Sequence, residues 1–319
     1  LQGMDVTIVK EQELPDGNFS TVRSPNPEEK DALTLAIEKA KEIGAELVLG
    51  TDPDCDRVGI AVKNGDEYVL FTGNQTGALL VQFVLTMKKA MLNEKSTLVK
   101  TIVTSELGAD IGKSFGLQIE ETLTGFKYIG DRINKYEESG EQEFVIGYEE
   151  SYGYLAGTHA RDKDAVVASM LICEMAAYYK AQGKSLAEVM DSLYDEFGYY
   201  FNVVESYTFE GAAGMEKMAD IMNSLRESAP NNFAGYEVIR VDDYKTSTSI
   251  NVADASVSTI ELPKSNVLAY TLMNGNKIIV RPSGTEPKIK AYITAIGKNK
   301  EEAGEIAEKL IAEANALMN

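Results

Sequence analysis

The sequence is poor in cysteine and in positive charge. Its 319 residues include only Cys55 and Cys173, too few for a disulfide framework, which favours a reducing compartment, the cytoplasm. It has 31 lysines and arginines and 50 aspartates and glutamates, which gives a net charge of −19. This excess of negative charge argues against a nucleic-acid or anionic-membrane partner. An anionic substrate would therefore need a local cluster of basic side chains.

The chain also lacks long hydrophobic runs, and it has a single histidine. The longest apolar stretch, residues 165–179, is broken by Glu174 and is too short to cross a bilayer, and no signal peptide is recognisable. His159 stands alone in a loop and receives no role. The sequence opens without an initiator methionine, and residues 6–9 have the pattern of a strand already under way. We therefore expect a piece of a longer protein.

The order of the expected elements predicts an α/β protein with consecutive domains. The length alone predicts two or three domains. Residues 74–198 alternate helices with strands, which is typical of a largely parallel sheet covered on both faces. Residues from 199 onwards pair several strands with two helices. We predict α/β domains with mixed or parallel sheets, followed by a smaller α+β C-terminal domain, with boundaries at 1–73, 74–198 and 199–319.

Local signals place individual elements. Residues 32–43 have helical apolar spacing, and Gly44 is expected to end that helix. A strand is expected at 46–49, and Asn-Gly at 64–65 predicts a hairpin turn between two further strands. The long apolar stretch at 165–180 predicts a helix.

Three aspartates follow an apolar stretch in the hexapeptide Asp-Pro-Asp-Cys-Asp-Arg at 52–57. Alternate residues of a strand lie roughly 7 Å apart, so Asp52, Asp54 and Asp56 reach one point only if the chain curls. The proline between the first two helps to fix such a bend. Because the chain is already strongly acidic, we expect a cation to neutralise them. Oxygen ligands of this kind suit a hard divalent cation, and we predict Mg²⁺.

Other interpretations of this loop are a calcium site, a phosphatase nucleophile and a plain acidic turn. An EF-hand needs glycine at its sixth position and glutamate at its twelfth, where this sequence has Arg57 and Lys63, so that interpretation fails. A haloacid-dehalogenase-type phosphatase also has an Asp-x-Asp pair after a hydrophobic strand, but it usually carries Thr or Val at the position of Asp56. From the pattern alone, a solvated acidic turn remains open.

Two further loops carry groups that suit a phosphorylated sugar. The segment Arg-Pro-Ser-Gly-Thr-Glu-Pro-Lys at 281–288 offers a guanidinium, two hydroxyls, a glycine amide and a lysine, as a phosphate clamp would. A plain turn is the alternative. The segment Gly-Tyr-Glu-Glu-Ser-Tyr-Gly at 147–153 follows a predicted strand, where α/β proteins place ligand sites. Its carboxylate and hydroxyl two residues apart suit adjacent sugar hydroxyls, and an acidic surface loop is the alternative.

Two lysines lie beside predicted turns. Lys163, within Arg-Asp-Lys-Asp at 161–164, precedes the long apolar helix, and one of the two aspartates is expected to cap that helix. The helix N-terminus is expected to lower the pKa of Lys163, which would suit proton transfer or phosphate binding. Lys127 ends the segment Thr-Gly-Phe-Lys at 124–127, which places a hydroxyl, a flexible backbone and an amine at a strand end.

In this order and spacing, the loops resemble those of the α-D-phosphohexomutase superfamily. The aspartate loop resembles its magnesium loop, 124–127 its Thr-Gly-x-Lys segment, 149–151 its sugar-binding Glu-x-Ser, and 281–285 its phosphate-binding loop. Pro-Asp-Gly-Asn-Phe at 15–19 resembles the long bacterial phosphoglucomutase/phosphomannomutase branch, which includes phosphopentomutase-like members. The resemblance implies four domains around one cleft, of which this chain would hold the later part of domain 2, domain 3 and domain 4.

The resemblance also implies a mechanism and residue roles. A phosphoserine would give its phosphoryl group to a hexose phosphate, and the hexose 1,6-bisphosphate, which is both intermediate and activator, would turn over and return the other group. Mg²⁺ would stabilise charge on that phosphoserine. The implied residues are Arg57 and Lys163 as catalytic groups; Asp52, Asp54 and Asp56 as metal ligands; and Thr124, Gly125, Lys127, Glu149, Ser151, Arg161, Arg281, Ser283, Gly284, Thr285 and Lys288 in substrate binding.

One departure limits the expected activity. The family's nucleophile is a serine followed by His-Asn-Pro in domain 1, whereas the only histidine here is followed by Ala-Arg. We therefore expect a fragment that does not turn over substrate by itself. The alternatives are a non-catalytic sugar-phosphate-binding module and a Mg²⁺-dependent phosphatase with Asp52 as nucleophile. The sequence does not separate glucose, mannose and pentose phosphates, and it does not indicate an oligomeric state.

Overall fold

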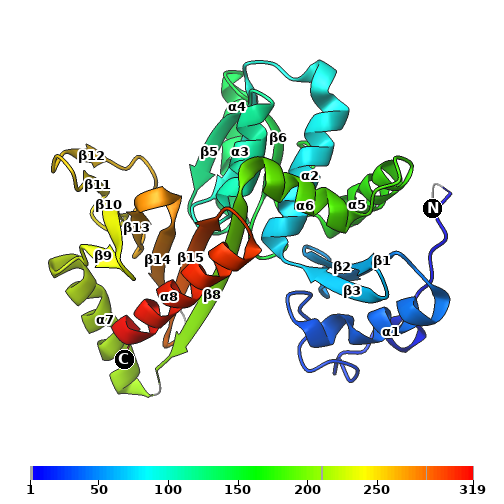
Figure 1. Ribbon diagram of the computed structural model, residues 1–319, viewed down its shortest axis with the longest axis horizontal. Helices are drawn as coiled ribbons and strands as arrows, with labels where there is room; N and C mark the ends of the chain where they lie inside the picture. Colours follow the sequence, from blue (N-terminus) through cyan, green and yellow to red (C-terminus); the bar gives the residue numbers. More distant parts are fainter. Residues whose placement is uncertain (1–2, 210, 285, 319) are drawn as a thin grey trace. The chain divides into compact units, whose positions relative to one another are not determined.

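The computed structural model describes residues 3–209, 211–284 and 286–318 (Figure 1). The chain forms two compact units, Leu1–Ser192 and Leu193–Asn319, which divide within helix α6 (Leu186–Phe197). Among the residues described, no helix has both the length and the hydropathy needed to cross a bilayer.

The first unit opens with an irregular segment rather than the expected strand. Residues 4–9 adopt no regular structure, and the side chains of Val6 and Ile8 are each 56% exposed. The expectation of a strand was wrong because alternating apolar residues form a strand only beside a hydrogen-bonded neighbour, and none pairs with this segment in the described part of the chain. Helix α1 (Thr34–Ile43) follows and ends at Gly44, whose φ of +72° fits the predicted cap.

An antiparallel sheet follows α1 and presents the aspartate loop at one end. Its strands are β1 (Leu47–Thr51), β2 (Val58–Asn64) and β3 (Glu67–Phe71). Helix α1 covers one face of the sheet, where Ala40 of the helix and Leu33, the residue directly before it, pack against Val48 and Ala61. Because Thr51 pairs with Val58, residues 52–57 form the loop of a hairpin.

The rest of the first unit is the predicted alternation of helices and strands. Its elements are α2 (Gly73–Lys88), β4 (Ser96–Thr101), α3 (Glu106–Ser114), β5 (Gln118–Thr122), α4 (Phe126–Ser139), β6 (Glu143–Tyr148), β7 (Tyr154–Ala156) and α5 (Ala165–Lys180). The sheet order is β5-β4-β6-β7, with β4 parallel to β5 and β6, and β7 antiparallel to β6. Every residue of β4 is buried, as expected for a central parallel strand. The loops after β4, β5 and β6 therefore leave the same edge of the sheet.

The second unit is the predicted α+β domain, built on an antiparallel sheet. Its elements after α6 are β8 (Tyr199–Thr208), α7 (Ala212–Glu227), β9 (Asn232–Phe233), β10 (Tyr236–Asp243), β11 (Thr248–Asn251), β12 (Val257–Thr259), β13 (Leu268–Leu272), β14 (Lys277–Pro282), β15 (Lys288–Gly297) and α8 (Lys300–Met318). The strand order is β12-β11-β10-β13-β14-β15-β8, and β9 pairs with β10. Tyr270, Ile278 and Ile293 lie in register across neighbouring strands and pack with Met222 and Leu310 of the two helices. The predicted fold class is confirmed.

Candidate functional site

The aspartate loop curls around the carboxylate of Asp52. The backbone N–H groups of Asp56 and Arg57 both donate to Asp52 Oδ1 at 3.0 Å, and Cys55 takes a φ of +58° at the bend. The curl brings one carboxylate oxygen from each of Asp52, Asp54 and Asp56 within 4.8 Å of one another. This is the geometry that the sequence requires if the three carboxylates share one cation.

The chemistry of this loop fits a hard divalent cation. Burial raises the pKa of Asp52; the Arg57 amide opposes this effect, while Asp56 and Asp54 raise the pKa further. Asp56 Oδ1 is buried and accepts no hydrogen bond from the described residues. Crowded carboxylates that include an oxygen without a donor suit Mg²⁺, which is bound through oxygen ligands.

Two side-chain cations lie against the aspartates. Lys163 Nζ is 2.8 Å from Asp56 Oδ2 and 3.0 Å from Asp162 Oδ1, and Arg57 Nε is 3.6 Å from Asp56 Oδ1. Burial lowers the pKa of Lys163, but its hydrogen bonds and charge interactions with the two aspartates outweigh burial and raise that pKa. The prediction of a lowered pKa was wrong, because two carboxylates in contact outweigh a helix dipole. Lys163 is therefore suited to hold an anion as a charged ammonium.

Backbone hydrogen bonds join the aspartate loop to two segments distant in sequence. Val58 N donates to Tyr152 O at 3.1 Å, and Arg57 forms an antiparallel bridge with Gly153, in the loop after β6. The N–H of Ala165, the first residue of α5, donates to Cys55 O at 3.1 Å. The structure thus brings the predicted metal loop, the predicted sugar loop and the start of α5 into one site.

The start of α5 is fixed by the cap that the sequence predicted. Asp164 Oδ1 accepts a hydrogen bond from Val167 N at 3.0 Å, so this aspartate is the capping residue. Its other oxygen, Oδ2, lies 2.9 Å from His159 Nε2. The histidine therefore has a local structural contact.

Glu149 is the buried carboxylate of the sugar loop. Its side chain is only 5% exposed, and its Oε1 accepts a hydrogen bond from Gly125 N at 2.8 Å. Burial raises the pKa of Glu149; the Gly125 amide and the charges of Lys163 and Arg57 oppose this effect. Ser151 is half-buried two residues further on. The predicted segments 124–127 and 149–151 are therefore in contact.

The other predicted substrate-binding residues of the first unit differ in how free their polar groups are to bind a ligand. The Thr124 hydroxyl is buried and has no hydrogen-bond partner among the described residues. Lys127 is exposed, with its Nζ 5.0 Å from the centre of the Tyr128 ring. Arg161, in contrast, donates to Asn134 Oδ1 at 2.5 Å and to two backbone carbonyls, so its guanidinium is held against α4.

The sequence motifs did not predict the ion pair between Glu28 and Arg57. Glu28 Oε1 lies 3.2 Å from Arg57 Nη1, and both side chains are about one-third exposed. The two residues are 29 positions apart, and local spacing carries no signal for such a contact. An ion pair this exposed adds little stability, so its effect is to orient the guanidinium.

The predicted phosphate loop is the β14–β15 hairpin of the second unit. Arg281 is half-buried near the end of β14, and Ser283 N donates to Lys288 O at 2.7 Å. Gly284 is exposed, and Thr285 lies outside the described residues. The arginine, the serine, the glycine and the lysine therefore all lie at the same end of this one hairpin.

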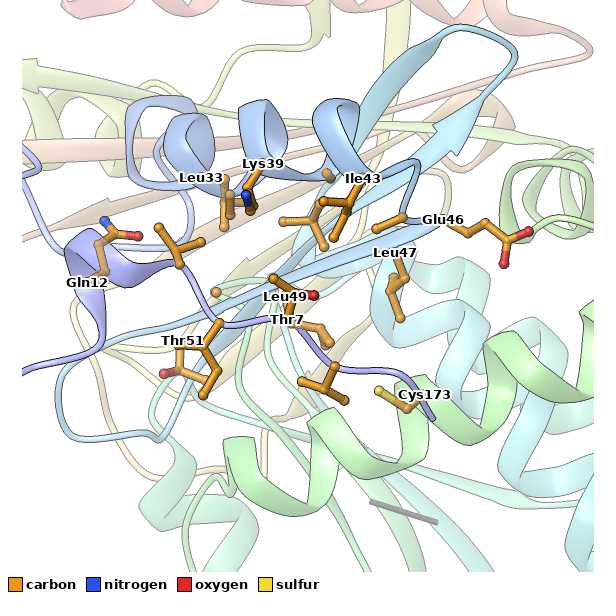
Figure 2. Close-up of a pocket in the computed structure, with 18 of the residues that line it drawn as sticks. Thr7, Gln12, Leu33, Lys39, Ile43, Glu46, Leu47, Leu49, Thr51 and Cys173 are labelled. Atoms are coloured by element: carbon orange, nitrogen blue, oxygen red, sulfur yellow. The ribbon is translucent and has the colours of Figure 1, made fainter. Parts of the chain in front are cut away.

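A large cavity of the first unit lies elsewhere. It has a volume of 2040 Å³ and extends along the outer edge of β1, as Figure 2 shows for Thr7, Leu47, Leu49 and Cys173. Asp52 is among the residues that line it, but none of the predicted sugar- or phosphate-binding residues that the structure describes does so. The volume of this cavity therefore does not identify it as the substrate site, because the predicted binding residues lie elsewhere.

A methyl group at Gly153 would collide with the site lysine. A Cβ at this position would lie 2.2 Å from Lys163 Cδ. We expect Gly153→Ala to displace Lys163 from Asp56 and to lower the free energy of unfolding by about 1–3 kcal/mol. Urea unfolding followed by circular dichroism measures this, with Gly17→Ala as the control because a Cβ there meets no atom within 4 Å. Equal stability of the two variants would contradict the packing described.

Family models match three successive parts of the chain. Residues 1–65 match alpha/beta/alpha domain II of phosphoglucomutase/phosphomannomutase, residues 72–197 match its alpha/beta/alpha domain III, and residues 239–313 match its C-terminal domain. The chain belongs to this family.

Curated relatives and solved structures agree with this assignment. The chain is 38% identical over 288 residues to a phosphoglucomutase of Staphylococcus epidermidis and 36% identical over 307 residues to one of Staphylococcus haemolyticus. These matches cover 90% and 96% of the chain, but only 52% and 55% of the relatives. The chain thus spans about half the length of these phosphoglucomutases.

Two solved structures share the fold at low identity. Parafusin, a phosphoglucomutase from Paramecium, matches with a TM-score of 0.65 and 19% identity, over 92% of this chain and 50% of its own. A phosphoglucomutase/phosphomannomutase family protein from Burkholderia thailandensis matches with a TM-score of 0.60 and 15% identity, over 92% of this chain and 51% of its own. At these identities the likeness shows the fold alone.

Proposed function

We propose that this chain carries the metal, sugar and phosphate loops of a phosphosugar mutase. In such an enzyme a phosphoserine gives its phosphoryl group to a hexose phosphate, and the bisphosphate turns over and returns its other phosphoryl group to the serine. The phosphoryl group thereby moves between C1 and C6. The observation that carries the proposal is the hydrogen-bonded junction between the aspartate loop and the Glu149 loop, Val58 N to Tyr152 O, in a chain of this family.

The aspartate loop would hold the metal. Asp52, Asp54 and Asp56 would bind Mg²⁺, which would supply positive charge opposite a phosphoserine. The two amide donors on Asp52 Oδ1 hold that carboxylate in place before any ligand arrives. Lys163 and Arg57 would add fixed positive charge, which an anionic substrate needs in a chain of net charge −19.

The sugar and phosphate loops would orient the substrate. The Glu149 carboxylate, held by the Gly125 amide, would accept hydrogen bonds from sugar hydroxyls, with Ser151 beside it. Thr124 and Lys127 would contribute a hydroxyl and an amine. Arg281, Ser283, Gly284, Thr285 and Lys288 would hold the non-reacting phosphate. Arg161 would first have to exchange its hydrogen bond to Asn134 or its ion pair with Glu137 for a substrate oxygen.

We expect no mutase turnover from this chain alone. Its sequence contains no serine followed by histidine, so the segment that would carry the phosphoryl group is missing from it. The assay supplies glucose 1-phosphate, Mg²⁺ and glucose 1,6-bisphosphate, and it measures glucose 6-phosphate through a coupled dehydrogenase. Turnover above background would contradict this expectation.

The same assay mixture separates the competing functions. Release of inorganic phosphate that disappears in Asp52→Asn would favour a phosphatase with Asp52 as nucleophile. If neither reaction occurs but the sugar phosphate binds, the coding sequence upstream of Leu1 decides. A Ser-His-Asn-Pro segment there supports the mutase, and its absence supports a binding module. A cytoplasmic location remains a prediction from the two unpaired cysteines.

A further inference from the structure

Lys100 is a buried cation, at the end of β4, to which the proposed mechanism gives no role. Its side chain is 0% exposed, and its Nζ lies 2.7 Å from Glu121 Oε1 and 3.2 Å from Glu106 Oε1. The ammonium also donates to the backbone carbonyls of Thr101 at 3.4 Å and Thr104 at 3.2 Å. An unpaired ammonium would be very costly to bury, and these acceptors offset that cost.

The ammonium joins three elements at the sheet edge where the predicted sugar loop begins. Lys100 belongs to β4, Glu121 to β5 and Glu106 to α3. Burial lowers the pKa of Lys100, but the charges of the two glutamates outweigh burial and raise it. Lys100 therefore stays charged at neutral pH and holds the turn that follows β4.

That turn contacts the backbone and side chain on either side of Glu149. The hydroxyls of Thr101 and Thr104 lie 2.8 Å apart. The Thr104 hydroxyl oxygen lies 3.5 Å from Tyr148 O, and the Thr101 hydroxyl oxygen lies 3.5 Å from Glu150 Oε2. Because each hydroxyl has one hydrogen, one threonine donates to the other, and the second donates to the segment around Glu149. Tyr148 and Glu150 directly flank Glu149 in sequence. A continuous series of polar contacts therefore leads from the buried ammonium to the sugar loop.

We propose that Lys100 is a positioning residue for Glu149. The buried ion pair fixes the turn after β4, and the Thr101 and Thr104 hydroxyls transmit that order to the residues flanking the Glu149 carboxylate. Lys100 touches no substrate. The proposal rests on the proposed function for the identity of the ligand, a sugar phosphate, but not for the effect on loop order.

The test compares variants of the intact chain in two measurements. Calorimetric titration with glucose 1-phosphate and Mg²⁺ gives affinity, and amide hydrogen exchange gives the order of segment 147–153. We expect Lys100→Met to weaken binding roughly tenfold and to speed exchange in that segment. Thr104→Val, which leaves the ion pairs intact, should act in the same direction. The double variant should weaken binding by less than the product of the two single effects, because both act through one series of contacts.

Lys113→Met is the matched control, because Lys113 is 59% exposed on α3 and pairs only with Asp110 one turn away among the described contacts. It should change neither affinity nor exchange. Unchanged exchange at 147–153 in Lys100→Met, or faster exchange spread evenly over the whole first unit, would overturn the proposal. If Lys100→Met does not fold, Thr104→Val decides. If the parent chain binds no sugar phosphate, the proposed function fails, and the exchange comparison still tests Lys100.

Discussion

Asp54→Asn should abolish the stabilisation of this chain by Mg²⁺. Asp54 is exposed, and its carboxylate is one of three that come within 4.8 Å of one another. The substitution leaves the hydrogen bonds to Asp52 and the ion pair between Asp56 and Lys163 in place, so the metal-free fold should persist. A ligand present at 100 times its dissociation constant adds about 2.7 kcal/mol of stability. Thermal unfolding with and without saturating Mg²⁺ should show a gain of this order in the parent chain and almost none in the variant.

The control for this prediction is Asp66→Asn, which removes another exposed carboxylate, in the β2–β3 turn. It should keep the full response to Mg²⁺. A parent chain whose unfolding does not respond to Mg²⁺, or an Asp54→Asn variant that responds equally, would show that the three aspartates form only an acidic turn.

Glu149→Gln should weaken sugar-phosphate binding strongly without unfolding the chain. The amide side chain keeps an acceptor for Gly125 N, but it loses the charge that strengthens hydrogen bonds from sugar hydroxyls. Hydrogen bonds to charged groups contribute about 1.5–3 kcal/mol, so we expect affinity for glucose 1-phosphate to fall by roughly 10- to 100-fold. Titration calorimetry measures this, with the exposed Glu138→Gln of α4 as control. Equal affinity in the two variants would show that Glu149 does not bind the substrate.

The pH dependence of binding and of stability should have opposite signs at Glu149. Burial raises the pKa of Glu149 above its ordinary value of 4.5. As pH falls through that raised value, the carboxylate is protonated and affinity is lost. For folding, the raised pKa means that protonated Glu149 contributes to stability. This contribution is fully present below pH 4.5 and is lost as the pH rises through the folded-state pKa. Glu149→Gln should therefore be as stable as the parent chain at neutral pH, or more stable.

Elements with a strong local pattern could be predicted from the sequence. The helix at 165–180 lies where expected, because a long apolar stretch follows directly on the capping residue Asp164. The segment 6–9 has a strand pattern but no partner strand among the described residues, and pairing is a tertiary property. The short strands β7, β11 and β12 were not predicted, since three or four residues carry too little periodicity.

The same limit applies to the candidate site. The curl of the aspartate loop follows from the spacing of its carboxylates, so it could be foreseen. The raised pKa of Lys163 depends on Asp56, which is remote in sequence, and the spacing of residues gives no sign of that contact. Lys100 looks like an ordinary polar residue within a strand, and only the fold reveals that it is buried between Glu106 and Glu121.

The most direct test of the account is a titration of the isotope-labelled chain with glucose 1-phosphate and Mg²⁺, followed by amide chemical shifts. If the aspartate loop and the Glu149 loop form one sugar-phosphate site, the amides of Gly125, of residues 149–153 and of residues 54–57 should shift together along a single binding curve. Shifts absent from these segments, or segments that titrate with separate affinities, would contradict the account.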